Sequence, residues 1–128
     1  MPFDVEHDCA EPLGFLIVTG KEKVLFMTDT AYTKHRFTGL THIMIEANFC
    51  ADLLERNVAA GIVESSRRRR LLESHMSIQR VVDFLKANDL SKLKEIHLMH
   101  LSSKNSDEQL FKSTIQKITG VPVYVCGA

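Results

Sequence analysis

Several features are missing or scarce in this sequence, and each absence excludes a class of protein. The 128 residues include no tryptophan and only three cysteines, Cys9, Cys50 and Cys126. Because these cysteines are odd in number and form no Cys-x-x-Cys pair, neither a disulfide framework nor a zinc ribbon is expected. No apolar run approaches the roughly 20 residues of a membrane span, and the acidic start lacks the pattern of a signal peptide. We therefore expect a cytoplasmic protein that does not enter a membrane.

Net charge is absent as well. Sixteen basic residues balance sixteen acidic ones, so the surface as a whole does not attract nucleic acid by its net charge. Any basic patch must therefore be local. The run of four arginines from Arg67 to Arg70 is the candidate patch. At 3.6 residues per helical turn only Arg67 and Arg70 share a face, which makes these two candidate phosphate contacts. A solvated helix whose arginines pair with Glu64 and Glu73 is the alternative.

Length and hydrophobic periodicity predict one α/β domain over residues 1–128. A chain that is 45% hydrophobic and 25% charged fits a single core, and it contains no repeat, low-complexity segment or linker. Strands are expected at 3–7, 13–19, 24–27, 42–47, 94–101 and 121–125. Helices are expected at 51–61, 65–73, 78–88 and 107–119, the third with Ser77 as its N-cap.

Four polar residues stand where a predicted strand ends or a helix begins: His7, Asp29, His75 and His100. Imidazoles and carboxylates are the ligands of hydrolytic zinc or manganese sites, and loops at strand ends let such groups converge. Each residue also has an ordinary interpretation, such as a surface histidine, a turn-forming carboxylate or an incidental histidine in a capping turn. His97 and His100 should point to opposite faces, and His100 is the better ligand candidate because a loop begins there.

The combination of motifs carries a resemblance to a known family. The runs HDCAEPLGF (7–15), TDT (28–30), EAN (46–48), SHMS (74–77) and HLS (100–102), with Asn105, resemble the carboxy-terminal half of metallo-β-lactamase-fold hydrolases. The similarity covers nearly the whole chain and is greatest to the bacterial branch of exonuclease-like proteins and cyclic phosphodiesterases. It implies half of an αββα sandwich, with one mixed β-sheet and helices on one face. It also implies metal-dependent hydrolysis of phosphodiester bonds, with nucleic acid among the candidate substrates.

The same resemblance assigns roles to individual residues. A complete site would hold two divalent ions, zinc or manganese, and three residues here would be ligands: His7, Asp29 and His100. His75 matches the non-ligand histidine that assists phosphodiester cleavage. Glu46 and Asn48 match residues near the pocket rim.

One hallmark of the family is missing. Its His-x-His-x-Asp-His loop does not occur, and no two histidines stand two residues apart. The chain thus lacks the amino-terminal half of the fold, and each metal would have at most two protein ligands, fewer than catalytic zinc usually keeps. We expect partial or no metal occupancy and no turnover by this chain alone. An uncovered sheet face should then pair with a second copy or with the missing half. The alternative is a non-catalytic oligomerisation or interaction domain derived from the same fold.

Overall fold

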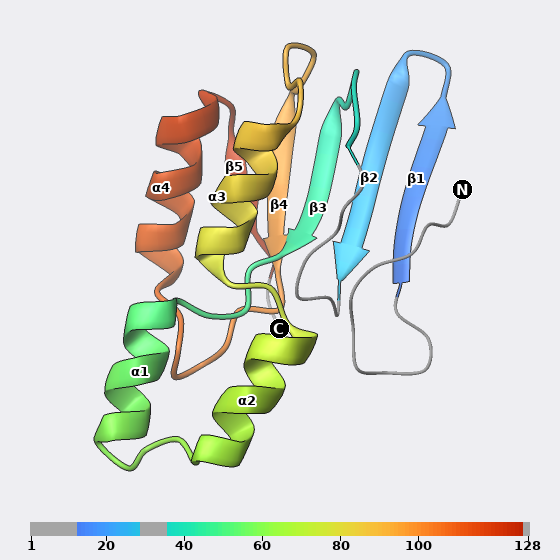
Figure 1. Cartoon of the computed structure of the whole chain (residues 1–128). Helices are drawn as coiled ribbons and strands as arrows, with labels where there is room; N and C mark the ends of the chain where they lie inside the picture. The colour runs from blue at the N-terminus through green and yellow to red at the C-terminus, as the bar shows by residue number, and fades with distance from the viewer. Residues whose placement is uncertain (1–12, 29–35, 127–128) are drawn as a thin grey trace.

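The structure is a computed structural model and describes residues 13–28 and 36–126. This part of the chain is built on a five-stranded mixed sheet whose strands lie side by side in chain order (Figure 1). The first two strands are antiparallel, and the second to fifth run parallel to one another. The strands are β1 (Leu13–Thr19), β2 (Glu22–Thr28), β3 (His42–Glu46), β4 (Glu95–Met99) and β5 (Val123–Val125).

The described helices occupy two positions around this sheet. α3 (Ile78–Ala87) and α4 (Glu108–Thr119) lie across one face, whereas α1 (Ala51–Ala59) and α2 (Ser65–Ser74) lie beyond the carboxyl ends of the parallel strands (Figure 1). The predicted α/β class, with one mixed sheet and helices on one face, is confirmed. The predicted strand at 3–7 lies outside the described residues.

Local sequence signals explain where most of these elements begin and end. The β1–β2 hairpin turns at Gly20, whose φ of 54° favours glycine, and Thr19 pairs directly with Glu22. Helix α3 begins at the predicted cap, because the Ser77 hydroxyl accepts a hydrogen bond from the Arg80 amide at 3.1 Å. Strand β2 is longer than the predicted 24–27 because every residue of β1 finds a partner on it.

The core lies between the sheet and its two covering helices. Side chains that point to the same face of the strands are almost fully buried there and pack against α3 and α4. The set includes Leu25, Ile43, Ile45, Ile96 and Leu98 from the sheet and Val81, Phe111 and Ile115 from the helices. One stripe of each helix is enough for this contact. Leu110 and Ile118, two further apolar residues of α4, are therefore 51% and 39% exposed.

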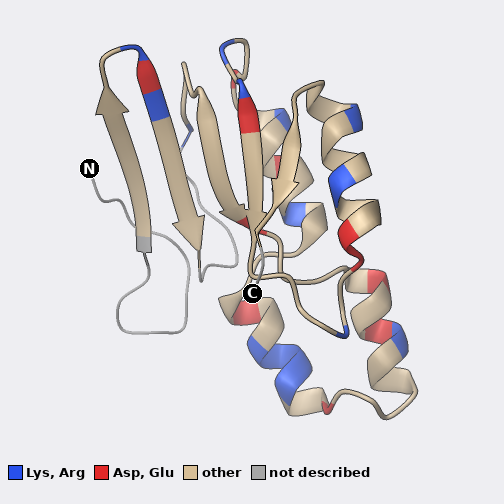
Figure 2. Ribbon diagram, turned by 180° about the vertical axis from the view of Figure 1, so that it is seen from behind, with Lys and Arg blue, Asp and Glu red and all other residues tan. Residues whose placement is uncertain are grey.

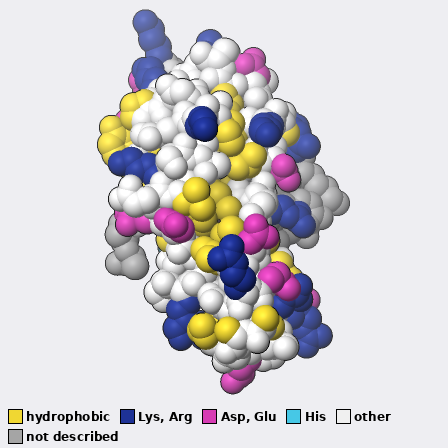
Figure 3. All heavy atoms as spheres, turned by 90° about the vertical axis from the view of Figure 1, so that its left-hand side faces the viewer, with side chains coloured by type: hydrophobic (Ala, Val, Ile, Leu, Met, Phe, Trp, Pro, Cys, Tyr) yellow, Lys and Arg dark blue, Asp and Glu magenta, His cyan; other side chains and the backbone are white. Residues whose placement is uncertain are grey.

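The surface around α4 has no cluster of charges of one sign. Figure 3 shows hydrophobic side chains there among Lys, Arg, Asp and Glu side chains of both signs. This mixture agrees with the zero formal net charge of the sequence. None of the helices in the described part of the chain is long and apolar enough to cross a membrane.

The opposite face of the sheet is not covered by any described helix (Figure 2). The strand register places five side chains next to one another across all five strands: Phe15, Phe26, Met44, His97 and Tyr124. Tyr124 is 47% exposed and stacks on His97 with ring centroids 5.1 Å apart. Sheets that are mostly parallel normally bury both faces. This row of mostly apolar side chains is therefore suited to contact with a second layer.

Candidate active site

The parallel strands place polar residues at one edge of the sheet. Because β2, β3 and β4 run in the same direction, their carboxyl ends meet there, and α1 and α2 border that edge (Figure 1). Thr28 is the last residue of β2, Glu46 the last of β3, and His100 the first after β4. His75 reaches the same place from the junction between α2 and α3. Four segments that are distant in sequence thus meet at one site.

Glu46 is the centre of this arrangement. Its side chain is fully buried, and Oε1 lies 2.8 Å from His75 Nδ1 and 3.2 Å from His100 Nδ1. Its other oxygen, Oε2, accepts a hydrogen bond from the Met76 backbone amide at 3.0 Å. A buried carboxylate needs such partners, because an uncompensated charge in the interior is costly. Both oxygens of Glu46 are therefore engaged, and the imidazoles shield the carboxylate from solvent.

The contacts with Glu46 constrain which ring nitrogen of each histidine can carry a proton. An ionised carboxylate only accepts hydrogen bonds, so the Nδ1 atom of His75 must carry the proton that faces it. His100 Nδ1 lies 3.2 Å from Glu46 Oε1 and 2.9 Å from the Thr28 hydroxyl, so it either donates to Glu46 or accepts from Thr28. In a neutral ring, an Nδ1 that donates leaves Nε2 with its lone pair. A histidine whose one nitrogen is held by a carboxylate is the usual arrangement of a metal ligand or a catalytic base. Glu46 is thus a positioning residue for both histidines.

His100 has an unusual backbone that brings its ring to this site. Its φ of 55° is the only positive value found for a non-glycine residue in the described part of the chain. Such a conformation ends the strand at Met99, earlier than the predicted 101, and redirects the side chain. The Thr28 hydroxyl lies 2.9 Å from His100 Nδ1, and Asn48 Nδ2 donates to the His100 carbonyl oxygen at 2.8 Å. Both contacts hold the residue in this strained position.

The predicted site residues fall into two groups. His75, His100, Glu46 and Asn48 are brought together, although Glu46 lies buried beneath the histidines rather than at an exposed rim. His7 and Asp29 lie outside the described residues, so their roles stay predictions. Among the residues that the structure describes, no group of three or more His, Cys, Asp or Glu side chains could hold a metal ion.

Sequence reasoning assigned no role to Thr28, although it stands directly before Asp29. Its hydroxyl lies in hydrogen-bond contact with His100, and its side chain is 6% exposed. The available signal was a polar residue at the exit of the apolar strand β2, where a side chain can reach neighbouring strand ends.

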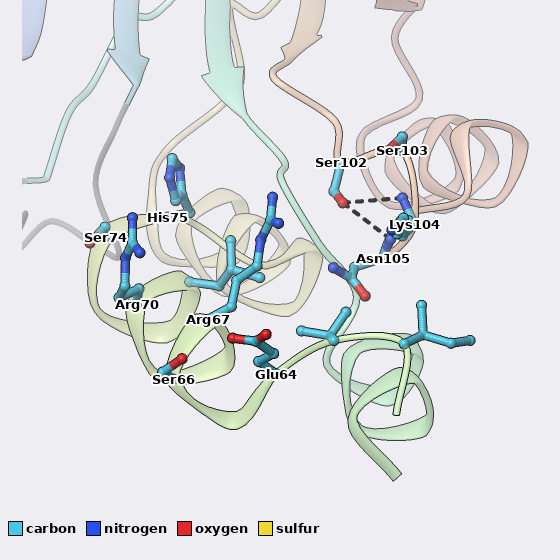
Figure 4. Close-up of a pocket in the computed structure, with 13 residues that line it drawn as sticks. Glu64, Ser66, Arg67, Arg70, Ser74, His75, Ser102, Ser103, Lys104 and Asn105 are labelled. Atoms are coloured by element: carbon cyan, nitrogen blue, oxygen red, sulfur yellow. Dashed lines mark hydrogen bonds between the residues drawn. The ribbon is translucent and has the colours of Figure 1, made fainter. Parts of the chain in front are cut away.

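A cavity of about 910 Å³ opens beside His75 (Figure 4). Arg67 and Arg70 line it, as expected for two residues on one helix face. In Figure 2 the basic residues form a blue segment of the α2 ribbon. Arg68 instead points to α1 and pairs with Glu55. The alternative pairing of these arginines with Glu64 or Glu73 is not seen among the described residues.

The comparisons with known proteins were consistent with a nuclease. No protein-family model matches the sequence. The chain is similar to the exodeoxyribonuclease YycJ of Bacillus anthracis. The two are 26% identical over 122 residues, which take in 91% of this chain and 45% of that protein. The chain thus spans less than half the length of this distant homologue.

Proposed function

We propose that this chain is the carboxy-terminal half of a metal-dependent phosphodiesterase or nuclease of the metallo-β-lactamase fold. The observation that carries the proposal is the buried Glu46, which holds two histidines by Nδ1 at the carboxyl edge of a parallel sheet. A structural ion pair alone would not require two imidazoles to be held with the same nitrogen inward. The exodeoxyribonuclease named above supports a nuclease in particular.

The residues of this chain would provide some, but not all, of the ligands of a metal site. His100 offers Nε2 as a ligand atom, with Nδ1 held by Glu46 and near Thr28, which is the second layer of contacts that metal-binding histidines need. His7 and Asp29 would be the other ligands from this chain, and the remaining ligands would come from the missing half. Divalent ions held there would supply Lewis acidity and charge neutralisation for phosphodiester hydrolysis.

His75 would donate a proton to the leaving group. The Glu46 carboxylate stabilises a positive charge on the His75 ring, because it accepts the Nδ1 proton at 2.8 Å. The ring can then hold a second proton at Nε2 and deliver it to the departing oxygen. Its side chain is 28% exposed, so a substrate phosphate can approach it.

We propose that the uncovered sheet face contacts the missing half. The row from Phe15 to Tyr124 spans the sheet, and more than half of the homologous nuclease has no counterpart in this chain. A second copy of the chain is the other occupant to test. Light scattering distinguishes these two occupants. If the face pairs with a second copy, the purified chain is a dimer, and if it pairs with the missing half, the purified chain is a monomer.

Metal content per chain, measured by mass spectrometry on the purified protein, tests the function. We expect partial occupancy in this chain alone and fuller occupancy once the missing half is supplied, and we expect that metal to be lost in a His7→Ala/Asp29→Ala variant and in His100→Ala. His97→Ala is the matched control, because His97 lies on β4, just before His100, but its side chain is on the uncovered face of the sheet and contacts Glu95 at 3.0 Å. Metal lost equally in His97→Ala would contradict the assigned ligands.

One observation favours a second candidate function. The uncovered sheet face would also suit a non-catalytic oligomerisation or interaction domain. That function predicts a stable, metal-free oligomer whose assembly does not change when His100 is replaced. Phosphodiesterase assays would then show no hydrolysis above background even when the missing half is supplied, whereas the proposed hydrolase should become active.

A further inference from the structure

The cavity beside His75 is lined by two segments that are far apart in sequence. One wall comes from α2 and the turn before it, and the other from the loop that follows β4 (Figure 4). Its volume of about 910 Å³ is large enough for a nucleotide-sized group. Polar and charged side chains dominate the lining, which makes it unlike an apolar ligand pocket.

The cavity is positively charged. Arg67 and Arg70 make no ion pair with a described residue, and Lys104 adds a third cation from the opposite wall. Of the described lining residues only Glu64 is acidic. Three cations against one carboxylate, within a concave site, attract an anion more strongly than the same charges on a flat surface. Paired guanidinium groups also match the oxygen geometry of a phosphate.

Asn105 provides an independent sign of a ligand. Its side chain is only 4% exposed and lines the cavity, yet its amide N–H groups have no acceptor among the described residues. The orientation of this amide is determined by its neighbour. Asn57 Nδ2 donates at 2.8 Å to the Lys104 carbonyl, which can only accept, so the same nitrogen must also donate to Asn105 Oδ1 at 2.7 Å. The Asn105 NH₂ group is therefore left to face the cavity.

The loop that carries Asn105 is well fixed. The Ser102 hydroxyl accepts hydrogen bonds from the backbone amides of Lys104 and Asn105, drawn as dashed lines in Figure 4. The Cys50 amide donates to the Asn105 carbonyl at 2.7 Å. The amide donor that faces the cavity is therefore held in a fixed place from three sides, where a ligand can accept a hydrogen bond from it.

We propose that this cavity binds a phosphate group of a nucleotide strand, next along the chain from the phosphate that reaches His75. Arg67 and Arg70 would hold its oxygens from one side and the Asn105 amide from the other. This assignment rests on the proposed nuclease function, and it names a nucleic-acid strand as the substrate class. A substrate with only one phosphate would leave the cavity unused.

The test is the binding of a short, fluorescently labelled single-stranded DNA, followed by anisotropy in EDTA so that no hydrolysis occurs. In Arg67→Gln/Arg70→Gln we expect weaker binding and a slope of log K against log salt that is smaller by about 0.7, the value for one lost phosphate contact. Arg69→Gln is the matched control, because Arg69 is an exposed residue of the same helix that does not line the cavity. Equal losses in both variants would overturn the proposal.

Asn105→Asp is the second variant. Its carboxylate can still accept the hydrogen bond from Asn57, so the loop keeps its anchor, but the cavity-facing donor becomes an anionic oxygen. We expect DNA affinity to fall by about tenfold or more, which is the usual effect of losing a hydrogen bond to a charged group. Unchanged affinity, with the fold verified by circular dichroism, would refute the role of Asn105.

Two further measurements separate this inference from the proposed function. Inorganic phosphate should displace the DNA only at far higher concentration, and competition equal to that of DNA would overturn the assignment of a nucleotide strand. Metal content and hydrolysis report on the function independently. DNA binding that depends on Arg67 and Arg70, in a protein that stays metal-free and inactive even when the missing half is supplied, would refute the hydrolase and leave the phosphate subsite in place.

Discussion

Replacement of Glu46 by glutamine tests the central feature of the site. The amide has the shape of the carboxylate but no charge, and it keeps only one accepting oxygen. Glu46 accepts from the Met76 amide and contacts the Nδ1 atoms of His75 and His100. In Glu46→Gln the rings can keep a contact only by accepting from the new NH₂ group, which moves their protons to Nε2.

The magnitude follows from the number of contacts. Hydrogen bonds to a charged group contribute about 1.5–3 kcal/mol, and neutral ones about 0.5–1.5 kcal/mol. Each of the three contacts made by Glu46 would change from a hydrogen bond with a charged group to one between neutral groups, with a loss of about 1 kcal/mol each. We therefore expect Glu46→Gln to lower the free energy of unfolding by about 3 kcal/mol. With a urea m-value of about 2 kcal/mol/M, the midpoint falls by about 1.5 M.

Urea denaturation followed by circular dichroism measures this change. Glu95→Gln is the matched control, because Glu95 also contacts two histidines, His42 and His97, but is 34% exposed. Exposed ion pairs contribute little, so the control should lose less than about 1 kcal/mol. A Glu46→Gln protein as stable as the parent would refute the reasoning, and so would equal losses in the two variants.

Two other predictions concern the backbone of His100 and the pH dependence of stability. His100→Gly should be more stable than His100→Ala by about 1 kcal/mol in urea denaturation, because glycine adopts a positive φ without strain; the reverse order would contradict the strain at this residue. The hydrogen bond from Lys94 lowers the pKa of Glu22 below its usual value near 4.5. This contact therefore stabilises the fold above that pH and ceases to do so as the pH falls through the lowered pKa. Thermal melts of Lys94→Met should show a loss near neutral pH that disappears in acid, and a loss independent of pH would count against the ion pair.

The sequence by itself determined most of the secondary structure. A continuous apolar, β-branched run located β1 at its observed bounds, Ser77 located the start of α3, and helical periodicity placed α4 within one residue of its observed start. These signals are local, because a cap or an apolar run acts within a few residues. Sequence also identified Glu46, Asn48, His75 and His100 as members of one site, through motifs whose combination resembles a known family.

Only the tertiary structure decided how those residues act. The burial of Glu46 beneath two imidazoles depends on parallel strands that bring the end of β3 next to the end of β4. The inward-held Nδ1 atoms follow from that contact and could not be read from spacing. Likewise the exposure of Leu110 and the outward-facing amide of Asn105 depend on which neighbours pack against each segment. Periodicity describes one element at a time, whereas a site is formed by elements that meet only in the folded chain.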